Sequence, residues 1–257
     1  MPRYFIHLAY DGTAYHGWQI QPNGTSVQQV LNEALTTILR QAVMVHGAGR
    51  TDAGVHAKQF FAHFDPEHSF SPEECKQLVF SLNAILPKDI AVYEVFPVKP
   101  DSHARFSAIS RTYEYLIIQR KDPFFVNRAW FNSQKIDVNL MNRGAAILME
   151  YSDFGCFSKS NTQVKTFKCQ IMHAAWENDG QLLKFIISAD RFLRNMVRAI
   201  VGTMTELGLG KITLDELIKI IESGNRKMAG FSVPAQGLYL TKIQYPESIR
   251  LDQDTDK

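Results

Sequence analysis

The chain has 257 residues, 45% hydrophobic and 21% charged, as expected of a globular protein, and no apolar run has the length of a membrane span or the pattern of a signal peptide. Its formal net charge of +2 does not by itself indicate a nucleic-acid ligand. The three cysteines show no C-x-x-C spacing, so neither a disulfide framework nor a structural zinc site is indicated, and a reducing, cytoplasmic location is expected.

The first half of the chain alternates strand and helix patterns. Strands are predicted at 4–10, 43–46, 57–64 and 90–96. A helix is predicted to begin after Ser26, where a capping-box pattern precedes an apolar stripe of helical spacing. A second helix begins after Ser71, with Pro72 at its first position, and ends near Leu86. The predicted order is therefore β-α-β-β-α-β.

The second half repeats this order without repeating the sequence. Predicted strands lie at 111–119, 166–176, 182–189 and 237–245, and predicted helices at 137–149, at 192–207 and after Thr213. The predicted fold class is α+β: two ferredoxin-like (split βαβ) halves that form a mixed, mainly antiparallel sheet, with helices on one face and a ligand cleft on the other face or between the halves. The predicted domains are 1–102 and 103–246, with a linker at 99–104 and a polar, frayed tail at 247–257.

The run G-R-T-D-A-G-V-H at 49–56 places one guanidinium and one carboxylate on a loop punctuated by glycines. Glycines at 47, 49 and 54 permit positive φ and the close approach of a ligand to the backbone. In extended backbone, Arg50 and Asp52 would point to the same side. The alternative is a tight turn in which Asp52 caps its own backbone, since Asp and Gly are ordinary turn residues.

Arginines interleave with aromatic residues in H-A-R-F-S-A-I-S-R-T-Y-E-Y at 103–115. Guanidinium groups pair with phosphate and aromatic rings stack on unpaired bases, so this mixture suits looped or single-stranded RNA. Alternatively, Tyr113 and Tyr115 simply share one face of a strand, while Arg105 and Arg111 are solvated.

Two arginines, Arg194 and Arg198, are four residues apart in the predicted helix at 192–207, and are therefore expected to be neighbours. An anion between them, either a phosphate or the Asp52 carboxylate, would relieve their repulsion. Alternatively, both arginines face solvent.

Histidines near the glycine-punctuated loop make a metal site worth testing. The side chains in question are Asp52, His56, His63 and Asp65. No H-E-x-x-H or comparable ligand spacing occurs, and no glycine-rich phosphate loop is present. Neither a metal nor a nucleotide cofactor is therefore predicted.

Asp52 is the best candidate for chemistry, because a carboxylate with an ordinary pKa of about 3.9 is ionised near neutrality and needs no activating base. It can attack an acetal-like sugar carbon or remove a proton beside it, and a neighbouring cation would keep it charged. Hydrolysis of a glycosidic bond would require a second carboxyl group, and none stands beside Asp52 in the sequence.

Seven motifs together resemble the tRNA pseudouridine synthase A family over nearly the whole chain. They are Y-D-G-T at 10–13, H-G-W-Q at 16–19, G-R-T-D-A-G-V-H at 49–56, L-N-A-I-L-P at 82–87, H-A-R-F-S-A at 103–108, M-V-R at 196–198 and Q-G-L-Y-L at 236–240. Each motif is weak alone, but their number and order make the resemblance specific.

This resemblance implies that a homodimer without a cofactor isomerises uridines 38–40 in the anticodon arm of tRNA to pseudouridine. It implies two ferredoxin-like halves around a basic RNA-binding cleft, with Asp52 as the nucleophile. Arg50 corresponds to the arginine associated with base flipping, Tyr113 to the tyrosine that packs on the flipped uracil, and Arg198 to an ion-pair partner of Asp52. The implied substrate-binding residues are Arg50, Tyr113, Arg198, Arg105 and Leu238.

The sequence departs from the family at three places. Gly155-Cys156 and residues 230–232 differ, and Lys165 stands where an arginine is frequent. A lysine keeps the charge of an RNA contact but loses the bidentate fork, so these departures bear on substrate position and not on the reaction type. Two alternatives stay open: a catalytically silent RNA-binding protein of the same fold, and a metal-dependent or glycoside hydrolase.

Overall fold

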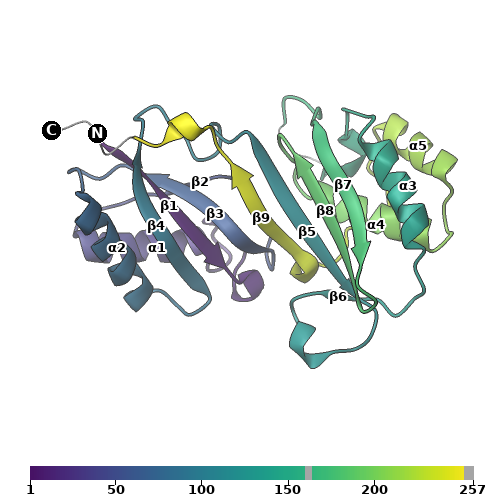
Figure 1. Cartoon of the computed structure of the whole chain (residues 1–257), viewed down its shortest axis with the longest axis horizontal. Coiled ribbons are helices and arrows are strands. Elements are labelled where there is room, and N and C mark those ends of the chain that lie inside the picture. The colour runs from purple at the N-terminus through teal and green to yellow at the C-terminus, as the bar shows by residue number, and fades with distance from the viewer. Residues whose placement is uncertain (160–163, 252–257) are drawn as a thin grey trace. The chain divides into compact units, whose positions relative to one another are not determined.

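The computed structural model describes residues 1–159 and 164–251, which form an α+β fold with nine strands and five α-helices in a mixed, mostly antiparallel arrangement (Figure 1). The chain divides into two compact units. Met1–Ile109 and the segment from Leu240 make up the first unit, and Ser110–Tyr239 the second. The predicted halves place the last strand in the second half, whereas all but its first two residues lie with the first unit.

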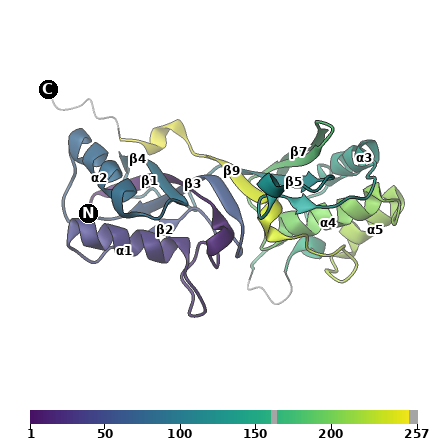
Figure 2. The same cartoon turned by 90° about the horizontal axis from the view of Figure 1, so that it is seen from below.

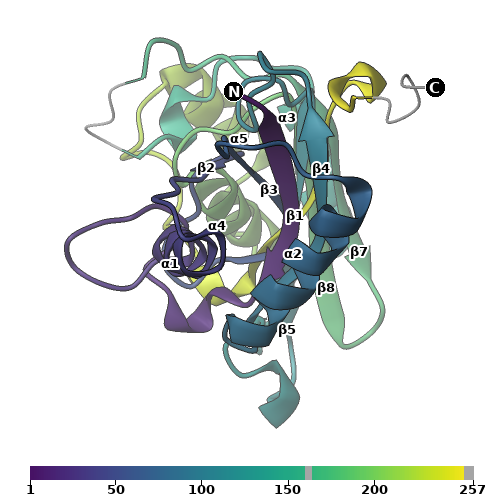
Figure 3. The ribbon, with the colours of Figure 1, turned by 90° about the vertical axis from the view of Figure 1, so that its left-hand side faces the viewer.

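In the first unit, antiparallel strands carry two helices. Its elements are β1 (Arg3–Tyr10), α1 (Val27–Leu39), β2 (His46–Gly47), β3 (His56–Phe64), α2 (Pro72–Ile85), β4 (Ile90–Val98) and most of β9 (Leu238–Gln244). The strand order is β4-β1-β3-β9, with β2 on β3. Helix α2 packs along β4 and contacts α1 (Figure 3). The predicted order of elements is confirmed for this unit.

Local side-chain chemistry explains where the helices of the first unit begin. The Ser26 hydroxyl accepts a hydrogen bond from the Gln29 N–H at the start of α1. At the start of α2, Ser71 and Glu74 form a reciprocal capping box, with Pro72 in the first turn. Both helix beginnings are thus confirmed, because a cap depends only on residues within one turn.

Strand β2 is shorter than predicted. The N–H of Val43 donates to Thr36 Oγ1 at 3.3 Å, and the N–H of Val45 donates to Asn32 Oδ1 at 2.9 Å. Because side chains of α1 take these donors, only His46 and Gly47 pair with β3. The strand predicted at 43–46 is therefore wrong in its extent.

The end of the first unit is ordered further than the sequence predicts. Glu247–Ile249 form a 3-10 turn, and the N–H of Leu251 donates to the Pro97 carbonyl at 3.3 Å. Arg250 forms an isolated β-bridge with Val98, the last residue of β4. The expected fraying is therefore wrong for residues 247–251, and the rest of the predicted tail lies outside the described residues.

The second unit combines an antiparallel sheet with three helices. Its elements are β5 (Ser110–Ile118), β6 (Trp130–Phe131), α3 (Val138–Leu148), β7 (Ile171–Asn178), β8 (Leu182–Ala189), α4 (Met196–Gly208) and α5 (Leu214–Ser223). The strand order is β5-β8-β7, and β6 pairs with β5 in parallel. Helix α3 packs on β7 and α4, and α5 contacts both α3 and α4 (Figure 2). The short strand β6 has no counterpart in the sequence prediction.

Helix α4 begins four residues later than predicted. Asn195 has a φ of 67°, in the left-handed region, and the N–H of Met196 donates to the Leu193 carbonyl at 3.1 Å. This backbone reversal separates Arg194 from the helix. The prediction that Arg194 and Arg198 are helical neighbours is therefore wrong. No helix in the described part of the chain is long and apolar enough to cross a membrane.

Candidate functional site

A tight turn presents Asp52 in the first unit. The loop that carries it begins where the Ala48 N–H donates to the Phe61 carbonyl at 2.8 Å. It ends in a turn in which the Val55 N–H donates to the Asp52 carbonyl at 3.2 Å, and Gly54 has a φ of 78°, as the third position of a type II turn requires. Asp52 is half-buried and Arg50 is exposed. The tight turn weighed as an alternative does exist, and it holds the carboxylate at the surface of the unit.

The glycines of this loop have different roles. Among the three glycines predicted to allow positive φ, only Gly54 has it. A Cβ on Gly47 would collide with the indole ring of Trp18, whereas a Cβ on Gly49 would meet no atom within 4 Å. Gly47 and Gly49 thus do not use the positive φ that glycine permits, and Gly47 instead provides room for the Trp18 ring.

A second glycine pair lies beneath the loop. Gly17 has a φ of 88°, and a Cβ there would collide with the Thr51 carbonyl oxygen. A Cβ on Gly12 would collide with the Val55 carbonyl oxygen. The turn that carries Asp52 thus rests on the backbone of Gly12 and Gly17, through Val55 after Asp52 and Thr51 before it. Sequence reasoning gave these glycines no structural role, although they stand in the D-G and H-G pairs of two of the recognised motifs.

Polar contacts fix the loop to the same segment. The Gly54 N–H donates to the Tyr15 carbonyl at 3.2 Å, and the hydroxyls of Tyr10 and Thr51 are 3.0 Å apart. At the start of β3, buried His56 accepts a hydrogen bond from the Gly12 N–H at Nδ1, 3.1 Å away. These contacts brace Asp52 from both sides in sequence, and they identify His56 as a structural histidine.

A buried tyrosine and a half-buried carboxylate stabilise the bracing segment itself. The Tyr15 hydroxyl donates to Asp89 Oδ1 at 2.6 Å. Burial, together with this carboxylate, raises the pKa of Tyr15 above its ordinary value, so the phenol stays protonated as a donor. The Asp11 N–H donates to the Asp89 carbonyl at 2.9 Å, which ties the segment to the residue before β4.

Three further histidines, His46, His63 and His103, form a structural cluster. His63 accepts a hydrogen bond from the Ala104 N–H at 3.2 Å, and its ring centroid lies 4.5 Å from that of His103 and 5.1 Å from that of His46. Burial, with the nearby charges of His103 and Arg3, lowers the pKa of His63 to about 3. In residues 1–159 and 164–251, no group of three His, Cys, Asp or Glu side chains is arranged to hold a metal ion.

Arg105 lies in the loop after β4. Its side chain is exposed, with the guanidinium carbon 5.4 Å from the ring centroid of Phe106, which is itself 75% exposed. Its backbone N–H donates to His103 Nδ1 at 3.0 Å. The loop therefore presents a cation and an aromatic ring to solvent.

Tyr113 lies on β5 of the second unit. It is half-buried, and its ring meets Phe192 edge-on, with centroids 5.1 Å apart and an interplanar angle of 88°. Two residues further, on the same face, buried Tyr115 donates its hydroxyl to the Pro234 carbonyl at 2.8 Å. The two tyrosines do share a strand face, as one prediction had it, and Tyr115 anchors the segment before β9.

Arg198, in the first turn of α4, holds the same segment. Its Nε donates to the Val233 carbonyl at 2.7 Å, and the Val233 N–H donates back to the Arg198 carbonyl at 3.3 Å. Burial raises the pKa of Tyr115, and the positive charge of Arg198 opposes this rise. Leu238 is buried, just after Gly237, where a Cβ would lie 2.7 Å from Tyr115 Cζ. Arg198 and Tyr115 thus both bind the segment of residues 233–238, which ends at buried Leu238.

The three places that depart from the family pattern differ in how far they are packed. Gly155–Phe157 form a buried 3-10 turn, in which burial raises the pKa of Cys156 to about 12. A Cβ on Gly202 of α4 would collide with the Phe231 carbonyl oxygen, and Ser232 Oγ accepts hydrogen bonds from Asn195 and Arg226. Lys165 is exposed. The substitutions at 231–232 therefore adjoin the start of α4.

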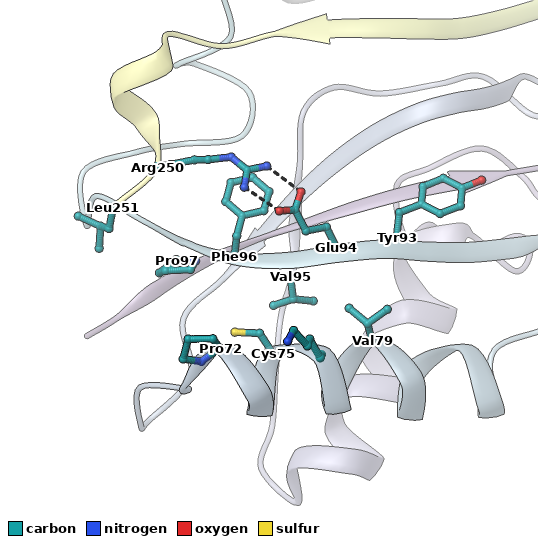
Figure 4. Close-up of a pocket in the computed structure, with 11 residues that line it drawn as sticks. Pro72, Cys75, Val79, Tyr93, Glu94, Val95, Phe96, Pro97, Arg250 and Leu251 are labelled. Atoms are coloured by element: carbon teal, nitrogen blue, oxygen red, sulfur yellow. Dashed lines mark hydrogen bonds and ion pairs between the residues drawn. The ribbon is translucent and has the colours of Figure 1, made fainter. Parts of the chain in front are cut away.

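A separate hollow of about 520 Å³ lies between α2, β4 and the C-terminal segment (Figure 4). Arg250 makes two hydrogen bonds to Glu94, at 2.6 and 2.7 Å, and its guanidinium lies 3.8 Å from the ring centroid of Phe96. Both groups are therefore already paired. None of the predicted site residues lines this hollow.

The structure thus distributes the predicted site over the two units. Arg50, Asp52 and Arg105 belong to the first unit, and Tyr113, Arg198 and Leu238 to the second. In each unit the residues lie on segments fixed by hydrogen bonds to neighbouring backbone. Residues missed by sequence reasoning are those that fix these segments, namely Tyr10, Gly17, Tyr115 and Val233.

Comparison with known proteins assigns the chain to a family. A family model described as tRNA pseudouridine synthase matches residues 6–107 and 151–246. The tRNA pseudouridine synthase A of Bacteroides fragilis is 53% identical over 248 residues, covering 96% of this chain and 98% of that protein. Those of Parabacteroides distasonis and Acetivibrio thermocellus are 50% and 40% identical, covering 97% and 93% of this chain and 98% and 97% of those proteins. The chain belongs to the tRNA pseudouridine synthase family.

Proposed function

We propose that this protein converts uridines 38–40 of the tRNA anticodon arm to pseudouridine, without a cofactor, with Asp52 as the catalytic nucleophile. The observation that carries the proposal is the half-buried carboxylate of Asp52 on a braced turn, within the part of the chain that the family model matches. Relatives named tRNA pseudouridine synthase A, at 50% identity and above, support the choice of substrate.

The reaction begins with extrusion of the target base. The reacting carbon is inaccessible in a stacked nucleotide, and unstacking costs a few kcal/mol. Arg50 is exposed two residues before Asp52, so its guanidinium is available to enter the space that the base leaves. We assign Arg50 this role.

Asp52 then promotes cleavage of the bond between the uracil nitrogen and the ribose. The detached uracil turns in the pocket, its carbon five bonds to the same sugar carbon, the proton on carbon five is lost, and the ring nitrogen released from the ribose takes up a proton. Either attack by the carboxylate on the sugar carbon or removal of the adjacent sugar proton starts this sequence, and both need an ionised Asp52. No other reactant enters, so the reaction is an isomerisation.

The second unit supplies the substrate-holding side chains in this proposal. Tyr113 stacks on the flipped uracil, and its half-buried ring already rests on Phe192, which limits its freedom. Arg198 pairs with Asp52 and keeps it ionised, while Leu238 forms part of the wall around the base. Arg105 binds the RNA backbone from its exposed loop.

We further infer two ferredoxin-like halves with helices on one sheet face, a basic cleft, a homodimer and a cytoplasmic location. The order β4-β1-β3 with β2 on β3 supports the first half, because a split βαβ unit of two crossovers has this strand order. Light scattering during gel filtration tests the dimer, which predicts twice the chain mass of 29.2 kDa.

Tritium release tests the reaction directly. Incubating the protein with tRNA that carries tritium at uracil carbon five should liberate the label, because isomerisation replaces that hydrogen with the sugar. We predict that Asp52→Ala abolishes release yet leaves tRNA affinity nearly intact, because phosphate contacts dominate binding. Asp215→Ala, an exposed position in α5, is the matched control and should behave as the parent protein.

Two outcomes would contradict these roles. No release by the parent protein from a competent tRNA would leave a catalytically silent RNA-binding protein as the better account. Loss of tRNA binding by folded Asp52→Ala would mean that this carboxylate positions RNA.

A further inference from the structure

Two hydroxyl groups, one from a buried tyrosine and one from a half-buried threonine, connect the first strand to the residue before Asp52. Tyr10, the last residue of β1, has its hydroxyl oxygen 3.0 Å from Thr51 Oγ1, and either group can be the donor. Tyr10 is 3% exposed. Its ring centroid lies 5.6 Å from that of Phe60 and 6.3 Å from that of Trp18. The phenol is therefore fixed in the core, and the loop is attached to it.

Thr51 is held on a second side as well. Its carbonyl oxygen sits where a side chain on Gly17 would be, so its backbone rests against residues 12–17. The next peptide leads directly to Asp52, whose own carbonyl closes the turn with the Val55 N–H. The residue immediately before the carboxylate is thus fixed through both its main chain and its side chain.

From this geometry we propose that Tyr10 and Thr51 are positioning residues that act as one hydrogen-bonded pair, setting the placement of the Asp52 carboxylate during catalysis. The inference rests on the proposed role of Asp52 as nucleophile. Bond cleavage and re-formation occur at one sugar carbon, so the carboxylate must keep its place while the uracil turns. An error of 1 Å in such a geometry can cost roughly a hundredfold in rate.

A purely structural role predicts a different result from a positioning role. A structural hydrogen bond affects the stability of the fold, whereas a positioning bond affects the rate of the bound complex more than tRNA binding. Tyr4 provides a matched control, because it lies on the same strand, is 2% exposed and bonds through its hydroxyl to the backbone of Phe70, away from the loop.

The experiment compares kcat and KM for tritium release, together with thermal unfolding, in Tyr10→Phe, Thr51→Val, the double variant, Thr51→Ser and Tyr4→Phe. We expect each of the first two to lower kcat roughly tenfold or more with KM within about threefold. The double variant should lose no more than the worse single variant, because the two hydroxyls form one bond. Thr51→Ser should restore most of kcat, and Tyr4→Phe should lower the melting temperature while keeping kcat.

The inference is overturned if Tyr10→Phe and Thr51→Val keep the parent kcat, if their losses multiply in the double variant, or if Tyr4→Phe loses kcat equally. These results are distinct from a failure of the proposed function. An inactive parent protein, or an active Asp52→Ala, would refute the assigned reaction or nucleophile, whereas a full-rate Tyr10→Phe beside an inactive Asp52→Ala refutes only the positioning pair.

Discussion

Around Asp52, single residues differ sharply in what their side chains, or lack of them, contribute. Gly49 is part of the G-R-T-D-A-G-V-H motif at 49–56, yet its Cβ position is open. Gly17 lies 35 residues upstream of Asp52 and has both a positive φ and the Thr51 carbonyl in its side-chain space. The strictest requirement for glycine near Asp52 is thus at position 17, outside the motif. It arises because the backbone of Thr51 approaches the backbone of Gly17 closely.

Substitution of these two glycines by alanine should therefore give opposite results. Gly17→Ala should lower the free energy of unfolding by about 2–4 kcal/mol through left-handed strain and the collision with Thr51, and should sharply reduce tritium release. Gly49→Ala should change stability by about 0.5 kcal/mol or less. Urea unfolding measures both, and equal losses would show that the packing beneath the loop is not the cause.

Protonation of His63 predicts an acid-sensitive stability. The pKa of His63 is about 3 in the folded protein and 6.5 in its ordinary state, so between these values the unfolded chain binds a proton that the folded chain does not. Stability should consequently fall as the pH drops below about 6.5, by up to about 1.4 kcal/mol per pH unit. Asp65 has a lowered pKa, so its contribution is lost only at more acidic pH, below its ordinary 3.8.

Urea unfolding between pH 7 and pH 4.5 tests this titration. His63→Asn should make the dependence on pH less steep, and His7 and His103, whose pKa values burial also lowers, should account for the slope that is left. An amide oxygen can still accept from the Ala104 N–H, so the substitution keeps that hydrogen bond. His68→Asn, at an exposed position, is the control and should keep the parent slope. An unchanged slope in His63→Asn would assign the acid sensitivity to other groups.

At the scale of elements, the sequence predicts those features that depend on neighbouring residues. The caps at Ser71 and Thr213 are reciprocal boxes within one turn, and strand β8 has the predicted limits. The start of α4 and the extent of β2 depend on distant partners. Asn195 bonds to Ser232, and the backbone of Val45 bonds to a side chain of α1, so no local pattern encodes either limit.

The segment after β9 should stabilise β4 through Arg250. Its guanidinium lies on Phe96 and makes two bonds to Glu94, but the pair is about half exposed, with side-chain exposures of 51% and 40%. Screening by solvent limits its contribution, so Arg250→Gln should cost about 1 kcal/mol of unfolding free energy. Lys184→Gln, which breaks a single surface contact to Glu177, should cost about 0.5 kcal/mol or less, and similar losses would contradict a role for Phe96.

At the scale of the whole molecule, hydrophobic periodicity predicts the repeated β-α-β-β-α-β order. It does not predict that most of the last strand belongs to the first unit. Tyr245, just after β9, packs its ring against Phe5 and Phe61 and donates its hydroxyl to the Ala104 carbonyl. Periodicity identifies a strand and its buried face, and it carries no information about which sheet receives the strand. The contacts that hold the Asp52 loop are equally unpredictable from local sequence, because Tyr10 and Gly17 are distant from the loop in the chain.

Separate fragments should show that the first unit needs the segment from Leu240 onward, whereas the second unit does not. A fragment of residues 110–239 retains every strand and helix of the second unit, together with the first two residues of β9, and should unfold cooperatively on heating. A fragment of residues 1–109 lacks β9, which lies beside β3, and residues 247–251, which lie beside β4. It should not unfold cooperatively. Circular dichroism with a thermal scan measures both, and cooperative unfolding of 1–109 alone would show that residues 240–251 are dispensable.

The division of the chain within β9 has a consequence for biosynthesis. Domains usually complete their folding in the order in which they leave the ribosome, from the N-terminus onward. Here residues 240–251 emerge after the whole second unit, although they belong to the unit whose other residues emerge first. The second unit is therefore complete in sequence while the first, which carries Asp52, still lacks a strand, so the first unit can finish folding only after the second unit has been synthesised.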